Sequence, residues 1–153
     1  MKKGIIAILL IVAILVVIIS MQIKQNAQNR QDVLSFNREY EKYQDKDLYG
    51  IDIVTVINKA VDNNAKNEIE KDANARYIND GEKSIQVELN LIAGVDAKTG
   101  EKETVTHPME RLIEVDLNGF IKNFNLTIFR VKEIEYHEKT GRISKIIFEQ
   151  IEE

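Results

Sequence analysis

The first apolar stretch of the chain is continuous and covers residues 4–23, with only two clearly polar positions. A helix of this length spans about 30 Å at about 1.5 Å per residue, which matches the hydrocarbon thickness of a bilayer. In lipid a helix satisfies its own backbone hydrogen bonds. The pattern predicts a membrane anchor over residues 1–23 and a single body domain over residues 24–153.

A narrower apolar stripe follows the anchor. Val33, Phe36, Tyr40 and Tyr43 recur at spacings of three, four and three, which places them on one face of a helix. No proline or glycine interrupts this part of the chain, so the helix is expected to continue to about residue 45, with residues 24–46 as a helical stem. We expect the stripe to pack on the body; a groove for a partner helix is the other interpretation.

A second helix is predicted near the start of the body. Apolar positions between residues 53 and 61 repeat at the helical spacing, Asp52 is a suitable N-cap, and Asn63 and Asn64 can end the helix. From residue 84 the period changes to two, which indicates a strand with one solvated face.

The rest of the chain is richer in strand signals. Residues 116–124 can form a short helix capped by Asp116, and residues 104–115 fit an extended segment or one helical turn. Two β-rich runs, 126–137 and 142–151, flank the turn sequence EKTG and predict a hairpin. The expected fold is therefore α+β. A long N-terminal helix, transmembrane and then extramembrane, and a short second helix accompany an antiparallel sheet of three to five strands that ends in the C-terminal hairpin.

Charge and composition exclude several function classes. The anchor contains two lysines and no acidic residue, so the body carries 19 basic and 25 acidic side chains, a formal charge of −6. An acidic body argues against a nucleic-acid partner, because phosphate binding needs concentrated Lys and Arg. The chain has no cysteine, which removes disulfides, thiolate metal sites and cysteine nucleophiles.

Candidate catalytic chemistry is sparse. The two histidines, His107 and His137, lie in a loop and at a solvated strand end, and two ligands do not make a closed metal site. The tripeptide KTG occurs twice, but no Ser-x-x-Lys accompanies it, so both copies are interpreted as turns. No catalytic, cofactor or metal site is predicted, and we expect a protein that is not an enzyme.

The chain begins with a short basic leader, MKKG, ahead of the apolar helix. This start resembles that of type IV pilins and pseudopilins, in which a peptidase cuts after the glycine and the exposed helices bundle into a filament. The resemblance implies processing between Gly4 and Ile5, and assembly with copies of itself or with other pilin-like envelope proteins. The family usually carries a glutamate five residues into the mature helix, where this chain has Leu9.

Two resemblances concern the rest of the chain. The order of a long helix, a second helix and a sheet is similar to the TadE-like branch of pseudopilins. The segments YGIDIVTVINKAVDNN and IEYHEKTGRISKIIFEQI resemble a family of uncharacterised single-pass membrane proteins of Gram-positive anaerobes. That resemblance implies an anchor and a class of organism, and no activity.

Retention of the anchor and its orientation are separate questions. A cleaved secretory signal needs small residues at its cleavage site, and the stretch after the apolar run lacks a small-x-small pattern. Basic residues flank both ends of the anchor almost equally, so orientation rests on the short N-terminal tail, which favours a cytosolic N-terminus and an extracytoplasmic body. We expect a membrane-anchored component of a pilus, secretion or envelope assembly, in contact with lipid. The alternative is a single-pass accessory protein that binds another membrane or envelope protein and never forms a filament.

Overall fold

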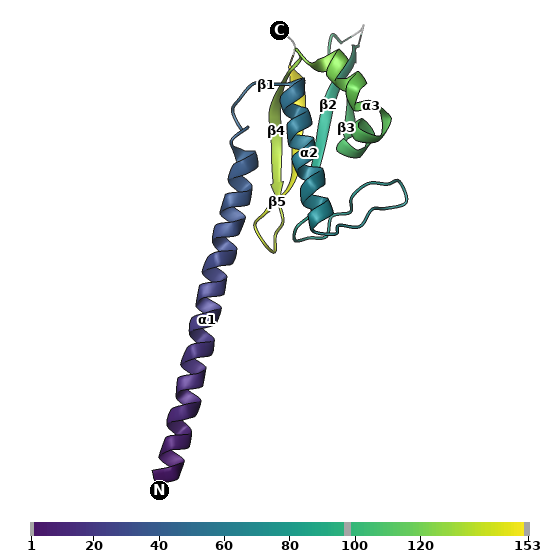
Figure 1. Cartoon of the computed structure of the whole chain (residues 1–153). Coiled ribbons are helices and arrows are strands. Elements are labelled where there is room, and N and C mark those ends of the chain that lie inside the picture. Colours follow the sequence, from purple (N-terminus) through teal and green to yellow (C-terminus); the bar gives the residue numbers. More distant parts are fainter. Residues whose placement is uncertain (1, 97–98, 152–153) are drawn as a thin grey trace. The chain divides into compact units, whose positions relative to one another are not determined.

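The computed structural model describes residues 2–96 and 99–151, with side chains for residues 10–96, 99–113 and 117–151. These residues contain three helices and five strands (Figure 1). In chain order they are α1 (Lys2–Glu41), β1 (Leu48–Tyr49), α2 (Gly50–Lys66), β2 (Gln86–Val95), β3 (Lys102–Pro108), α3 (Met109–Phe124), β4 (Ile128–Tyr136) and β5 (Ile143–Ile151).

The chain divides into two compact units, Met1–Ser35 and Phe36–Glu153. In the first unit, the large apolar side chains from Leu10 to Ile23 are 45–66% exposed, although such side chains are normally buried in a soluble protein. The helix is long and apolar enough to cross a membrane. One long apolar N-terminal helix therefore fits the predicted membrane anchor.

The second unit is built on one five-stranded sheet in the order β1-β4-β5-β2-β3. The pairs β1–β4, β4–β5 and β2–β3 are antiparallel, whereas β2 and β5 run parallel, with Val87 opposite Ile146 and Leu89 opposite Phe148. The predicted α+β class and C-terminal hairpin are confirmed. The sheet is mixed rather than wholly antiparallel, because β5 inserts between β4 and β2, and periodicity within a strand does not encode its neighbours.

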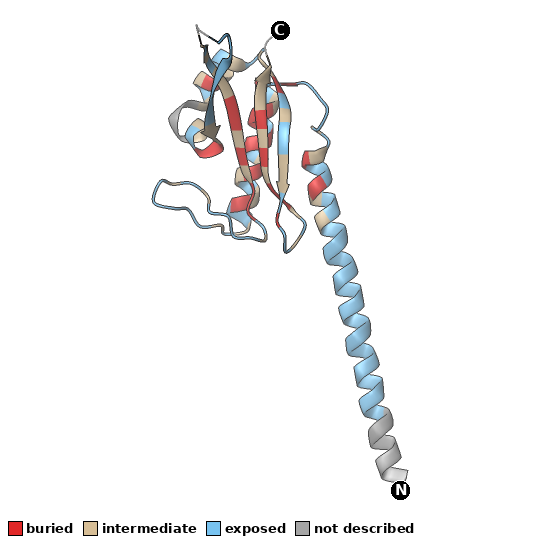
Figure 2. Ribbon diagram, turned by 180° about the vertical axis from the view of Figure 1, so that it is seen from behind, coloured by how far each residue is buried: buried red, intermediate tan, exposed pale blue. Residues whose placement is uncertain are grey.

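Helices α2 and α3 lie on one face of the sheet (Figure 1). The buried core lies between this face and the helices, and Figure 2 shows buried residues recurring along the central strands and along α2. Its fully buried members include Ile53, Val56, Ile57 and Ala60 of α2, Val87 and Leu89 of β2, Phe129 of β4, and Ile146 and Phe148 of β5.

The opposite face of the sheet is polar. Lys145 of β5 places its Nζ 3.8 Å from a carboxylate oxygen of Glu88 on β2 and 3.4 Å from one of Glu135 on β4. Thr106 donates a 2.7 Å hydrogen bond to the side-chain oxygen of Asn90 on the neighbouring strand. The alternation predicted from residue 84 onward thus separates an apolar inner face from a solvated outer face.

Helix boundaries differ from the predicted ones at four places, one of which is the end of α2 at Lys66, two residues beyond Asn64. Helix α1 ends at Glu41, four residues before the predicted end, and α2 begins at Gly50. Asp52 consequently lies in the first turn of α2 and not at its N-cap; its carboxylate accepts a 3.0 Å hydrogen bond from the Tyr49 N–H. The Asp52 carboxylate still satisfies a backbone donor at the start of α2. The sequence therefore indicated the correct helix end, but the N-cap is Tyr49, three residues earlier.

Helix α3 begins at Met109, seven residues before the short helix predicted at residues 116–124. Pro108 immediately precedes it in extended backbone, with φ −71° and ψ 152°. Proline is well suited to a helix start because its fixed φ is close to the helical value and its missing N–H would have no partner there. Pro108 therefore marks the β3–α3 junction.

Candidate functional site

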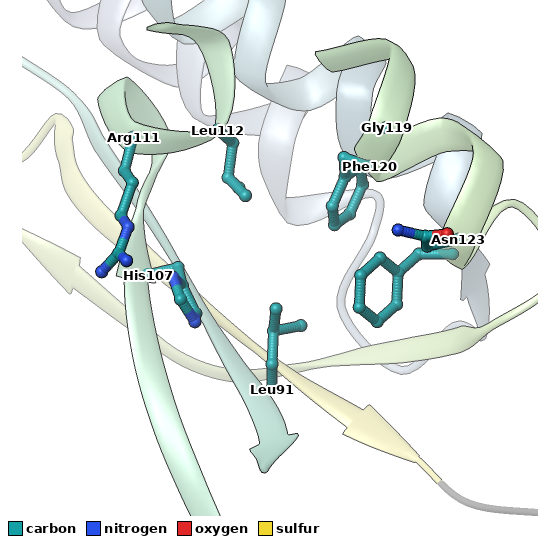
Figure 3. A pocket seen from close by; sticks show the side chains of 8 residues that line it. Leu91, His107, Arg111, Leu112, Gly119, Phe120 and Asn123 are labelled. Atoms are coloured by element: carbon teal, nitrogen blue, oxygen red, sulfur yellow. The ribbon is translucent and has the colours of Figure 1, made fainter. Parts of the chain in front are cut away.

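A cleft of about 250 Å³ opens between α3 and the strands β2 and β3 (Figure 3). Its walls combine four apolar side chains, those of Leu91, Leu112, Phe120 and Phe124, with His107, Arg111, Gly119 and Asn123. Binding sites for small molecules commonly have this composition, with mostly apolar walls and a few polar groups.

The strand side of the cleft is fixed by the β2–β3 ladder. His107 pairs with Leu89, and Leu91 pairs with Val105. Directly paired residues point to the same face of a sheet, and Leu89 is fully buried on the inner face. His107 and Leu91 therefore both face α3, and Figure 3 shows their side chains entering the cleft from the strands.

The helix side follows the 3.6-residue repeat of α3. Phe120 and Phe124 are four residues apart, as are Gly119 and Asn123, so both pairs share one side of the helix. The Phe120 and Phe124 rings stack with centroids 5.0 Å apart, and each lies 6.3 Å from the ring of Phe129. This aromatic group holds the C-terminal half of α3 against the sheet, and Gly119 leaves the adjacent space unfilled.

The charged end of the cleft is formed by His107 and Arg111. Burial and the neighbouring guanidinium of Arg111 both lower the pKa of His107 from its ordinary value. No carboxylate is present among the eight lining residues. Within the described part of the chain, neither side chain makes a hydrogen bond or an ion pair. Among the lining residues whose side chains the structure describes, the cleft therefore has a positive end and no carboxylate.

The polar groups that line the cleft are an imidazole, a guanidinium and an amide. A hydroxyl, thiol or carboxylate that could act as a nucleophile or pair with the imidazole is not among the described lining residues. The described residues also contain no group of three or more His, Cys, Asp or Glu that could hold a metal ion.

The predicted packing stripe divides between the two units of the chain. Tyr40 is 2% exposed, and Phe36 and Tyr43 pack against the same core, all within the second unit. Burial raises the pKa of the Tyr40 hydroxyl. Val33 is half-buried and belongs to the first unit. The Arg142 guanidinium lies 3.9 Å from the centroid of the Phe36 ring, so one aromatic of the stripe contacts a cation.

Two buried asparagines were not identified from the sequence. Asn37 of α1 donates to the Gly141 carbonyl at 2.9 Å and accepts from the Ile143 N–H at 3.0 Å. Asn64 of α2 donates to the Ile85 carbonyl at 2.7 Å and accepts from the Ile85 N–H at 2.9 Å. Gly141 and Ile85 lie just outside the strands and Ile143 is the first residue of β5, so each amide serves backbone groups at a strand end.

The spacing of apolar residues along the sequence could have indicated both asparagines. Asn37 is four residues after Val33 and three before Tyr40, and Asn64 is four after Ala60. Both are therefore polar residues on an otherwise apolar helix face. Because an unpaired amide is costly to bury, such a residue indicates a specific hydrogen-bond partner in the core.

The histidine predicted at a solvated strand end is buried. His137 is 4% exposed, and its Nε2 lies 2.8 Å from the Ser84 carbonyl oxygen. The solvated interpretation was wrong, because the loop before β2 covers the β4–β5 turn. His137 joins two segments of the fold, and His107 lines the cleft.

Gly4 and Ile5, the predicted leader-processing site, belong to helix α1, and the structure does not describe their side chains. Processing at this site stays a prediction. No family model, curated protein sequence or solved structure matches the chain. Function must therefore be inferred from the chain itself.

Proposed function

We propose that the protein is a membrane-anchored, extracytoplasmic, non-enzymatic component of an envelope assembly, similar to a pilin or pseudopilin. The observation that carries the proposal is the apolar first unit, whose large side chains are 45–66% exposed from Leu10 to Ile23. Lipid or neighbouring apolar helices would cover this surface, because its exposure to water is unfavourable.

The second unit supports a role outside the bilayer. Its apolar residues are gathered in one core with two helices on one sheet face, and the other face carries the Lys145, Glu88 and Glu135 ion pairs. A domain with this distribution is stable in water and needs no lipid. The absence of a nucleophile among the residues that line the cleft supports a binding or structural protein over an enzyme.

A second candidate is a single-pass accessory protein that binds another membrane or envelope protein and forms no filament. Leu9 favours this candidate, since it stands where the pilin family usually has a glutamate. The membrane segment also has few small residues for close helix contact, only Ala7, Ala13 and Ser20 beyond Gly4. Self-association would therefore depend on its large aliphatic side chains.

The lack of native cysteine allows a direct test of topology. Lys83→Cys introduces one thiol at an exposed position of the body. In intact cells, a membrane-impermeant maleimide should label this variant to the same extent as after detergent lysis, and the parent chain provides the unlabelled control. Labelling that requires lysis would place the body in the cytosol and contradict the proposed orientation.

The two candidates differ in helix contacts. Ile14 and Val16 are both exposed and point about 200° apart around the apolar helix, so Ile14→Cys/Val16→Cys gives each chain two thiols on opposite faces of the membrane segment. In an assembly of identical helices, oxidation should give a ladder of products larger than a dimer. An accessory protein should instead give a single cross-link to a different chain or none, and that result would favour the second candidate.

A further inference from the structure

The cleft between α3 and the β2–β3 strands combines a cationic side with apolar walls, and no carboxylate is among its described lining residues. Its apolar walls consist of Leu91, Leu112, Phe120 and Phe124, and one side carries His107 and Arg111. Figure 3 shows His107 and Arg111 together at one side of the cleft, with Leu91 of the strands facing Leu112 and Phe120 of the helix. A ligand that fits must match both regions at once.

The charged end calls for an anion. Arg111 is always protonated, and its guanidinium presents a planar set of donors suited to a carboxylate. His107 is half-buried beside it and can donate from its ring to the same oxygens. An ammonium ligand would meet repulsion from Arg111, and a neutral ligand would gain no ion pair with its guanidinium.

The dimensions restrict the size of the ligand. A volume of about 250 Å³ corresponds to about eight water molecules at ~30 Å³ each. Small ligands with about eight non-hydrogen atoms match this space, whereas a long acyl chain or a folded peptide would not be enclosed. Gly119 lines the cleft without a side chain, so a large side chain introduced at this position is expected to occupy part of the space.

We propose that this cleft binds a small monocarboxylate with a compact apolar part, such as a short-chain or aromatic acid, with the carboxylate at Arg111 and His107 and the apolar part against Leu91, Leu112 and the two phenylalanines. This site is separate from the membrane segment. It would give an anchored envelope protein a sensing or carrying role in addition to an assembly role, and it does not depend on filament formation.

The test uses the full chain in lipid nanodiscs with leucine methyl groups labelled for NMR. Hexanoate has eight non-hydrogen atoms and should shift the methyl signals of Leu91 and Leu112 in a saturable manner. Leu126 is 79% exposed, does not line the cleft and should not shift, so it provides an internal control. Hexanol, hexylamine and acetate form the comparison set, because each lacks one feature of the proposed ligand.

We expect hexanoate to bind more tightly than hexanol or acetate, and hexylamine not to bind. Arg111→Gln should weaken hexanoate binding by about fivefold, the upper end for one exposed ion pair, and should leave hexanol unaffected. Gly119→Leu should abolish binding by filling the cleft, whereas Asn118→Leu, at an exposed position of the same helix, should leave binding unchanged. Retained Leu126 and amide signals would show that the variants fold.

Several results would overturn the proposal. One is the absence of any shift of Leu91 and Leu112 at millimolar hexanoate. A second is equal binding of hexanol or hexylamine, which would mean that the cationic end has no role. Unchanged binding in Gly119→Leu would place the ligand elsewhere on the protein.

Discussion

The buried amide of Asn64 provides the sharpest test of how the body is held together. Its side chain is fully buried and forms two hydrogen bonds with one residue, to the carbonyl of Ile85 at 2.7 Å and from its N–H at 2.9 Å. Ile85 directly precedes β2 and is itself fully buried. The Asn64 amide therefore forms the two backbone hydrogen bonds that a neighbouring strand would otherwise form with Ile85.

Asn64→Ala should destabilise the body strongly. It leaves one buried N–H and one buried carbonyl of Ile85 without their partner, at a cost of about 1–3 kcal/mol for each group. Alanine regains about 0.5–0.7 kcal/mol of helix propensity relative to asparagine. The net loss is therefore about 1.5–5 kcal/mol, which is a large share of the ~5–15 kcal/mol that stabilises a typical domain.

The assay is urea unfolding of the full chain in detergent micelles, followed by tyrosine fluorescence and circular dichroism. The matched control is Asn58→Ala on the same helix, where the side chain is exposed and a change within about 0.5 kcal/mol is expected. If Asn64→Ala unfolds within about 0.5 kcal/mol of the parent protein, the amide does not serve Ile85 as described.

Asn64→Asp tests the direction of the two hydrogen bonds. A carboxylate still accepts from the Ile85 N–H, but it places a second acceptor against the Ile85 carbonyl and buries a charge. Its pKa in the folded state should therefore lie above the unfolded value, so stability should be highest at acid pH and fall as pH rises through the folded-state pKa. A pH-independent loss of stability would contradict this assignment of donor and acceptor.

Three further predictions concern other parts of the molecule. Gly50→Ala should lower stability by about 1–3 kcal/mol, because the new Cβ would lie 2.7 Å from the carbonyl carbon of the last residue of α3, whereas Gly94→Ala meets nothing within 4 Å and should be neutral in the same urea assay. Arg111→Gln should raise the pKa of His107 toward its ordinary value, since a positive neighbour that opposes the imidazolium is removed; an unchanged NMR titration of the ring would refute this coupling. A fragment that begins at Gln25 should be soluble and unfold cooperatively, because the apolar core lies in the second unit; aggregation without a cooperative transition would argue against an independent domain.

Much of the fold follows from periodicity. The continuous apolar run, the alternation in residues 85–91 and the EKTG turn each predict an element that the structure contains, because each pattern is local. Gly141 in that turn has φ +70°, the left-handed conformation for which glycine is suited. Strand order is different: the parallel pairing of β2 with β5 depends on how distant segments pack, and no short pattern encodes it.

The candidate cleft was harder to predict for the same reason. His107 comes from β3, whereas Arg111 and the phenylalanines come from a helix whose start was placed seven residues too late. Without the correct start of α3, the sequence does not show that Phe120 and Phe124 lie on the side of the helix that faces β2 and β3. Asn37 and Asn64, by contrast, could have been noticed as polar residues on apolar helix faces.

The measurement that tests the central claim most directly is the intact mass of the protein isolated from the membrane of its native host. If the apolar helix is an assembly stem, the chain should have lost Met1 to Gly4 and begin at Ile5, and Gly4→Leu should stay full length and fail to assemble. A native chain that begins at Met1 or Lys2, together with a Gly4→Leu variant that behaves like the parent, would contradict the pilin-like proposal and leave a plain membrane anchor.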